Sequence, residues 1–226
     1  MQTRLYRPMV ALVFSSLTAC ALLASRALLF GHARHLYLVW NLFLAWLPLL
    51  LALLLHWLQQ SGRYPRSLTL ATLLLWLFFF PNASYIFTDV VHVSPKTLAH
   101  FWPDLVVVMV FALTGLTLGF VSLYLVQRLV ARRLGWIAGW GFVCAVAFLN
   151  GFGVYAGRFL RWNSWDVMLD PAKVTLGGLA WLAAMPQHPR LLLFPALFSL
   201  LMFVAYVLLY SLTELADGEA RPEPVR

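Results

Sequence analysis

Long apolar runs separated by short polar stretches make up most of the chain and predict helices that cross a membrane. Six runs approach or exceed the roughly 20 residues that span a bilayer core. A lone segment in lipid must satisfy its own backbone hydrogen bonds, so each run is expected to be helical. The predicted fold class is an all-α polytopic membrane helix bundle. The expected spans are Pro8–Leu29, Leu36–Leu58, Ser67–Thr88, Asp104–Val126, Leu134–Ala156 and Leu191–Leu212.

The longest connection between spans, Gly157–Arg190, contains another apolar stretch. The sequence AKVTLGGLAWLAAM after Pro171 is too short to cross a bilayer, so it predicts an interfacial or re-entrant segment before the last span. The residues from Glu214 onward are polar and contain proline, which predicts a disordered tail. We therefore expect one transmembrane domain over residues 1–213 and a tail over 214–226.

Composition supports a membrane protein and excludes a nucleic-acid-binding one. The chain has 226 residues, 62% hydrophobic and 11% charged, whereas a soluble domain carries about 25% charged residues. The formal charge of +8 comes from basic residues spread singly or in small groups between apolar runs. This distribution is typical of helix ends that meet anionic headgroups.

Known catalytic and cofactor motifs are absent from the sequence. There is no phosphate-binding Gly-x-x-x-x-Gly-Lys, no Gly-x-Ser-x-Gly and no His-Glu-x-x-His. Cys20 and Cys144 both lie in apolar runs without metal-ligand spacing, which predicts free thiols. We expect no metal and no cofactor.

The distribution of Lys and Arg favours cytoplasmic termini. With the N-terminus inside, nine basic residues fall in inside loops and seven in outside loops, and a compact Arg128, Arg132, Arg133 cluster lies inside. Either orientation brings the end of the third span and the end of the fifth to the same face, because an even number of crossings separates them. The start of the second span, with Trp40 and Asn41, lies on that face too.

Polar side chains interrupt the end of the third span, in the stretch FFFPNASYIFTDVVHV. Four of them lie three, four and three residues apart, which places them on one stripe of a helix, with a threonine beside it. Tyrosine and asparagine are also common at membrane boundaries and helix ends, so ordinary interfacial residues are the alternative. The set is Asn82, Tyr85, Thr88, Asp89 and His92.

Pro81 is expected to break the third span, and Asn82 to cap a fresh helical turn after it. Asp89 then lies near the C-terminal end of a helix, where the macrodipole disfavours an anion. A nearby cation would remove this penalty. We therefore expect a basic partner for Asp89, and consider Asp89 and His92 as candidate acid–base groups.

The segment GRFLRWNSWD, directly after the fifth span, can supply that cation. An arginine in the bilayer costs about 2.5–3.5 kcal/mol on insertion scales, so it faces protein, water or a headgroup. If the helix continues, Arg158, Arg161 and Trp165 share a face. The bland alternative is snorkelling arginines beside tryptophan anchors. The candidate ligand-binding residues from this part of the chain are Asn150, Arg158, Arg161, Trp162, Asn163, Trp165 and Asp166.

Three stretches together resemble an uncharacterised bacterial multipass membrane family, the domain-of-unknown-function family thirteen sixty-one. They are FFPNASYIFTD, GLTLGFVSLYLVQRLV and GFGVYAGRFLRWNSWDV. The resemblance covers about Leu73 to Pro171, and Ser84 stands where the family usually has proline. It groups the two polar motifs and implies a bacterial inner membrane, but it implies no activity.

Three functions remain open at this point. The first is an integral membrane protein that binds an anionic lipid or a small anionic ligand, with Asp89 positioning an arginine when no ligand is present. The second is an intramembrane enzyme acting on a lipid-linked substrate, with Asp89 or His92 as acid or base. The third is a transporter, disfavoured because the polar residues gather at one face rather than at the midplane. The expected partners are membrane lipids.

Overall fold

The computed structural model describes residues 2–31, 35–62, 64–93, 98–162, 166, 170–184 and 186–219. The regular elements in these residues are helices, and six helical stretches are long and apolar enough to cross a membrane. This confirms the polytopic all-α helix bundle. The elements are α1 (Gln2–Phe30), α2 (Tyr37–Ser61), α3 (Arg66–Tyr85), the 3-10 helix η1 (Ile86–His92), α4 (Leu98–Leu134), α5 (Trp136–Arg158), α7 (Pro171–Ala184), the 3-10 helix η2 (Pro189–Leu192) and α8 (Leu193–Glu219).

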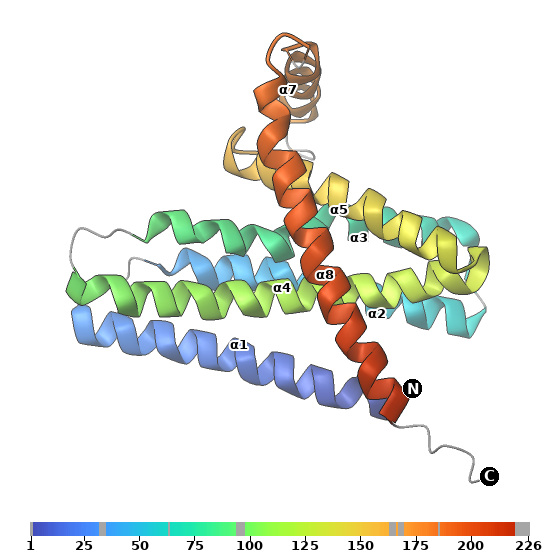
Figure 1. The fold of residues 1–226 in the computed structure, drawn as a ribbon, viewed down its shortest axis with the longest axis horizontal. Coiled ribbons are helices and arrows are strands. Elements are labelled where there is room, and N and C mark those ends of the chain that lie inside the picture. The colour runs from blue at the N-terminus through green and yellow to red at the C-terminus, as the bar shows by residue number, and fades with distance from the viewer. Residues whose placement is uncertain are drawn as a thin grey trace.

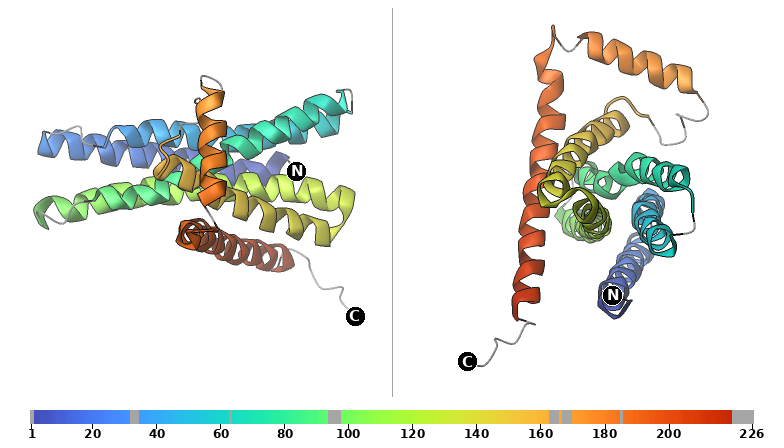
Figure 2. Two further views of the ribbon diagram at one scale, coloured as in Figure 1. Left: turned by 90° about the horizontal axis from the view of Figure 1, so that it is seen from above. Right: turned by 90° about the vertical axis from the view of Figure 1, so that its right-hand side faces the viewer.

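Helices α1 to α5 run side by side along the long axis of the molecule, and α8 crosses them steeply (Figure 1). The right-hand view of Figure 2 looks nearly down the first five helices, while α8 runs across the view. Gly151 permits this crossing, because a Cβ there would collide with the Ser199 hydroxyl and the Pro195 carbonyl. Small residues at such contacts let two helix backbones approach closely.

Helix α4 is the most buried of the six spans and packs against α1, α2, α3 and α5. Gly115 and Gly119 bring its backbone onto α3, where a Cβ on Gly115 would lie 2.7 Å from the Ala83 carbonyl oxygen. Because Ala83 lies near the end of α3, this contact also holds η1 against α4. The small residues at this spacing in α4 thus pack helices together.

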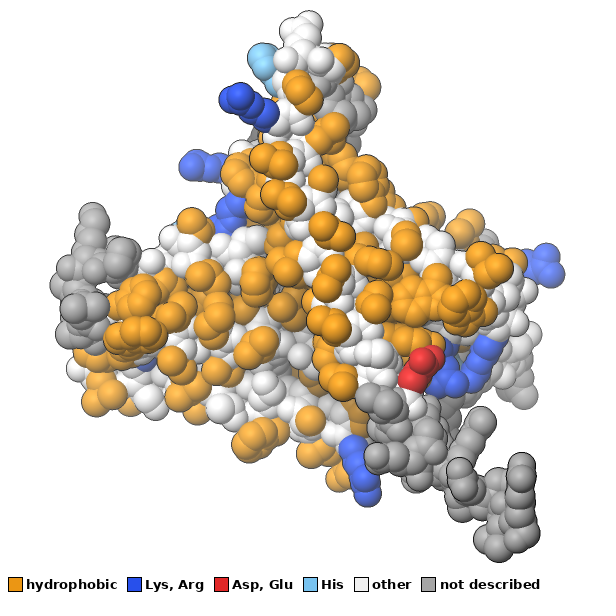
Figure 3. Space-filling view, viewed as in Figure 1, with side chains coloured by type: hydrophobic (Ala, Val, Ile, Leu, Met, Phe, Trp, Pro, Cys, Tyr) orange, Lys and Arg blue, Asp and Glu red, His pale blue; other side chains and the backbone are white. Residues whose placement is uncertain are grey.

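Much of the molecular surface is apolar, as expected for side chains that face lipid. In the view of Figure 3, hydrophobic side chains cover most of the face crossed by α8, and Lys and Arg lie toward its edges. Leucines such as Leu197, Leu200 and Leu208 are each more than half exposed on α8. Water would disfavour such a surface, whereas hydrocarbon would not.

The structure corrects two expectations about the third span. Pro81 does not break it, since α3 continues to Tyr85 and tightens into the 3-10 helix only at Ile86. Asn82 is inside α3 and does not cap a new turn; its amide Nδ2 donates to the Phe79 carbonyl at 3.0 Å. Neighbouring helices allow a proline inside a membrane helix by re-satisfying the backbone. Here the Pro81 ring packs against Gly153 of α5.

The apolar stretch after Pro171 forms the 14-residue helix α7. A Cβ on Gly177 would lie 2.6 Å from Cζ2 of Trp162, so the backbone of α7 approaches that indole closely. The last helix continues to Glu219, so the first residues expected in the tail are helical; residues 220–226 lie outside the described part.

Candidate functional site

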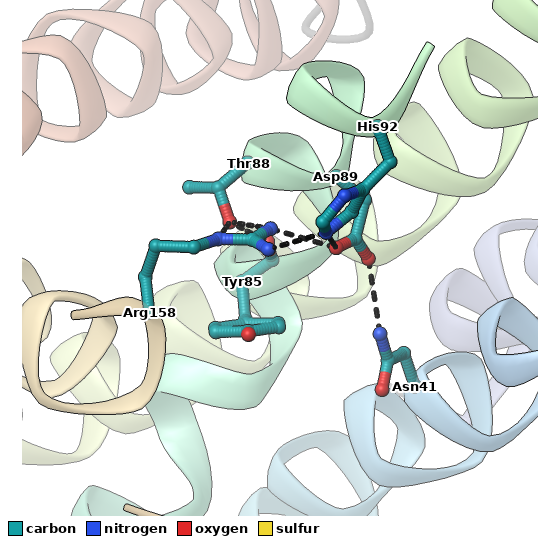
Figure 4. A network of polar contacts seen from close by, with 6 residues as sticks. All are labelled: Asn41, Tyr85, Thr88, Asp89, His92 and Arg158. Atoms are coloured by element: carbon teal, nitrogen blue, oxygen red, sulfur yellow. Dashed lines mark hydrogen bonds and ion pairs between the residues drawn. The ribbon is translucent and has the colours of Figure 1, made fainter. Parts of the chain in front are cut away.

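Arg158, the last residue of α5, joins α5 to the end of the third span. Its Nη2 donates to Oδ1 of Asp89 at 2.7 Å, and Nε and Nη2 donate to the Thr88 hydroxyl at 3.0 and 2.6 Å. The guanidinium lies over the Tyr85 ring, 4.8 Å from its centroid (Figure 4). The expected basic partner for Asp89 is therefore present.

Asp89 is buried, with 1% of its surface exposed, yet both carboxylate oxygens have partners. Oδ1 accepts from Arg158, and Oδ2 accepts from Nδ2 of Asn41 on α2 at 3.0 Å. A buried charge is tolerated only when it is paired and hydrogen-bonded. Asp89 thus ties α2, η1 and α5 together at one end of the bundle.

The 3-10 geometry of η1 sets where His92 lies. With about three residues per turn, side chains at i and i+3 stand in line, so His92 lies directly beyond Asp89, with Nε2 3.9 Å from Oδ1. The same Nε2 lies 2.8 Å from Nη1 of Arg158. An arginine can only donate, so His92 accepts in this hydrogen bond. The Tyr37 ring packs edge-on against His92.

A cavity of about 660 Å³ opens beside this network. Helices α2 and α5 each pack on α3, and the cavity lies between them. Its polar end includes Asn41, Asn82, Asp89, His92 and Arg158. The remaining wall is mostly aromatic and aliphatic and contains Tyr37, Trp40, Leu44, Leu77, Phe78, Pro81, Tyr85, Leu149, Gly153, Ala156, Gly157 and Trp162.

The structure brings most of the third-span candidates together at this cavity. Asn82, Tyr85, Asp89 and His92 all line it, so the three-four-three spacing does place them on one side. Thr88 does not line the cavity, but its hydroxyl accepts two hydrogen bonds from the Arg158 guanidinium. Their role in binding a ligand stays a prediction.

Of the described candidate residues that follow α5, only Trp162 lines the cavity. Trp162 lines the cavity, but Arg161 is exposed and takes no part in the network. Arg161 was expected to share a face with Arg158 on a continuing helix; instead α5 ends at Arg158, and Arg161 has a left-handed φ of 56°. Asp166 is described but does not line the cavity. Asn163 and Trp165 lie outside the described residues.

Asn150 does not line this cavity either. It is buried near a separate void of about 10 Å³, where its Oδ1 accepts from Ser84 at 2.8 Å. Its Nδ2 has no hydrogen-bond partner among the described residues. Leu149 and Gly153 are four residues apart and line the cavity, whereas Asn150 is rotated by about 100° from Leu149 around the helix. Its side chain therefore faces the void between α3, α4 and α8.

A second buried ion pair was missed by the sequence reasoning. Nε of Arg26 donates to Oδ1 of Asp104 at 2.7 Å, and Nε2 of His35 lies 3.4 Å from Oδ2. All three residues are at least 95% buried. The parity of crossings could have found the pair, because span one ends and span four begins on the same face.

The two ion pairs lie near each other. The Tyr37 ring contacts both histidines edge-on, at 6.0 Å from His35 and 5.9 Å from His92. Asn41, which binds Asp89, is one turn further along the same helix. The first turns of α2 therefore lie between a structural ion pair on one side and the cavity on the other.

Comparison with known proteins identifies a family for the chain, but that family has no described activity. A family model described as "Protein of unknown function (DUF1361)" matches residues 40–209. That range contains the Arg158–Asp89 pair and every residue that lines the cavity except Tyr37, but not Arg26 or His35. Neither a curated protein nor a solved structure matches the chain.

Proposed function

The chain belongs to this DUF1361 family of unknown function, and we propose that it is a membrane protein that binds an anionic group, such as a phosphate, at the polar end of its cavity. Arg158 carries this proposal. Its guanidinium lines the cavity and makes four hydrogen bonds to Thr88, Asp89 and His92. A guanidinium has five donors, so one N–H on Nη1 has no partner among the described residues.

The surroundings of Arg158 suit an anion that arrives from the membrane side. The Tyr85 ring and the apolar wall keep bulk water away from one face of the guanidinium, which strengthens its hydrogen bonds to an anion. Asp89 neutralises Arg158 when the site is empty and orients it for the ligand. Because Asp89 competes with the ligand, we expect reversible rather than very tight binding.

The binding experiment uses the full chain purified in detergent. The fraction of protein that retains phosphatidic acid would be measured by native mass spectrometry for the wild type and Arg158→Gln. We expect at least a tenfold loss in the variant. Arg161→Gln is the matched control, because Arg161 is three residues away but exposed. Equal retention of phosphatidic acid, together with equal binding of inorganic phosphate, in wild type and Arg158→Gln would refute the proposal.

A second candidate function is an intramembrane enzyme acting on a lipid-linked substrate, and the position of His92 favours it. His92 lines the cavity, and half of its side-chain surface is exposed. Asp89 is a poor acid or base in this arrangement, since both of its oxygens are occupied and it is buried. His92 would be the proton-transfer group, with Arg158 stabilising negative charge. Turnover lost in His92→Gln, with lipid retention intact, would favour an enzyme.

We also propose a bacterial inner membrane as the location, with both termini in the cytoplasm. The supporting observation is the Arg128, Arg132, Arg133 cluster at the end of α4, opposite the Arg158 end of the bundle. The cavity would then open at the outer leaflet. A reporter that is active only in the cytoplasm, fused after residue 226, should be active. An inactive fusion would reverse the orientation.

A further inference from the structure

We infer that the ligand of this cavity is a membrane lipid, whose phosphate binds at Arg158 and whose hydrocarbon chain lies in the apolar part of the same cavity. The inference rests on the proposed anion site and adds the class of molecule that carries the anion. It rests on how the cavity is divided into a polar end and an apolar wall, which a small soluble anion would not require.

The ionisable groups are confined to one end of the cavity. Arg158, Asp89 and His92 lie at the ends of α5 and η1, whereas Leu149 lies nine residues before Arg158 and Leu77 lies twelve residues before Asp89. A helix rises about 1.5 Å per residue, so Leu149 lies roughly 13 Å from Arg158 along α5. An anion alone would leave that length empty.

The cavity is lined by apolar side chains that are also exposed on the surface of the helix bundle, where lipid tails would lie. Trp40 on α2, Phe78 on α3 and Leu149 on α5 all line the cavity, and they are 52%, 37% and 47% exposed. Each of the three helices thus contributes one apolar side chain that both lines the cavity and is exposed on the surface. A ligand already in the bilayer can enter between α2 and α5 without carrying its chain through water.

Volume and closeness of packing agree with a chain in the groove. A cavity of about 660 Å³ is within the range of about 300–1,000 Å³ that is common for small-molecule sites. Gly153 and Gly157 bring the α5 backbone against the Pro81 and Tyr85 rings of α3, where a Cβ on Gly157 would lie 3.0 Å from the Tyr85 ring. All four residues line the cavity, so one of its walls combines helix backbone with ring surfaces.

Burial of the chain supplies little of the affinity. Lipid tails are as apolar as the groove, so moving a chain between them gains almost no hydrophobic free energy. Selectivity must come from the phosphate at Arg158 and from the shape of the groove. This distinguishes the site from a water-facing pocket, where each buried methylene contributes about 0.8 kcal/mol.

The test uses phosphatidic acid that carries a photoreactive diazirine on its acyl chain, incubated with the full chain in detergent. After irradiation, we expect labelled peptides that contain Leu44, Leu77 or Leu149. Leu44→Trp, which fills the apolar part, should reduce the labelling at least fivefold. Leu50→Trp is the control, because Leu50 is an exposed residue of α2 outside the cavity.

Radiolabelled inorganic phosphate separates failure of the inference from failure of the proposed function. If phosphate binds in an Arg158-dependent way while the acyl probe labels no cavity peptide, the anion site stands and the lipid inference is overturned. If neither probe depends on Arg158, both are overturned. Because Arg158→Gln leaves the Asp89 carboxylate unpaired, the double variant Asp89→Asn/Arg158→Gln is measured alongside it to show that loss of binding is not loss of folding.

Discussion

Arg158 and Asp89 are 69 residues apart in sequence, yet their Nη2 and Oδ1 atoms lie 2.7 Å apart at one end of the helix bundle. The pair is a local tie between α5 and η1, and Asn41 extends it to α2. Asp89 is almost fully buried, while 15% of the Arg158 side-chain surface remains exposed. The carboxylate is therefore structural and the guanidinium is accessible, which sets different consequences for their substitution.

The first prediction concerns the asymmetry of this pair. Removing one partner leaves a buried charge uncompensated, which typically costs about 3–5 kcal/mol. Arg158→Gln should therefore lower the thermal unfolding temperature in detergent more than the double variant Asp89→Asn/Arg158→Gln. Fluorescence-detected unfolding of the wild type and these two variants would measure it. A double variant that unfolds at the same temperature as Arg158→Gln, or lower, would contradict the coupling.

The second prediction concerns the Arg26–Asp104 pair, which we regard as purely structural. The residues are buried away from the cavity. Asp104→Asn should destabilise the protein by about 3–5 kcal/mol, while the retained fraction of phosphatidic acid in the folded protein stays within twofold of the wild type. Native mass spectrometry of the surviving folded fraction would measure this. A tenfold loss of lipid with normal stability would instead assign the pair to the binding site.

The third prediction uses two adjacent glycines of α7. A Cβ on Gly177 would lie 2.6 Å from the Trp162 ring, whereas one on Gly178 would lie at 3.7 Å, an ordinary contact. Gly177→Ala should therefore shift α7 away from Trp162 and weaken lipid retention, and Gly178→Ala should not. Since alanine favours helix by up to about 1 kcal/mol over glycine, Gly178→Ala should be neutral or slightly stabilising. Equal behaviour of the two variants would contradict the close approach.

The polar stripe at the end of the third span shows that residue spacing alone predicted which side chains share one side of the helix. Asn82, Tyr85, Asp89 and His92 line the cavity as their spacing indicates, even though the helix changes from α to 3-10 between them. The change is harmless to the prediction because Asn82 and Tyr85 are three residues apart in α3, and Asp89 and His92 are three residues apart in η1, where that spacing keeps side chains in line. Pro81 misled the prediction of a break, since its effect depends on a neighbour, Gly153, that only the fold supplies.

The arginine motif shows the opposite case. Arg158 and Arg161 are equivalent by spacing on a continued helix, but the chain turns directly after Arg158. Asn150 likewise points to a different void from the one expected. In both cases the side-chain direction depends on where a helix ends or which neighbour it faces, and neither is encoded in the local pattern of residues.

The amino-acid sequence by itself determined the helical membrane architecture, because hydrocarbon leaves a long apolar segment no other way to satisfy its backbone. It also determined which helix ends share a face, since that follows from counting crossings. Only the tertiary structure decided which charges meet, namely Arg158 with Asp89 and Arg26 with Asp104. Those pairings depend on helix rotation and close approach at small residues, which are set by packing across the whole bundle.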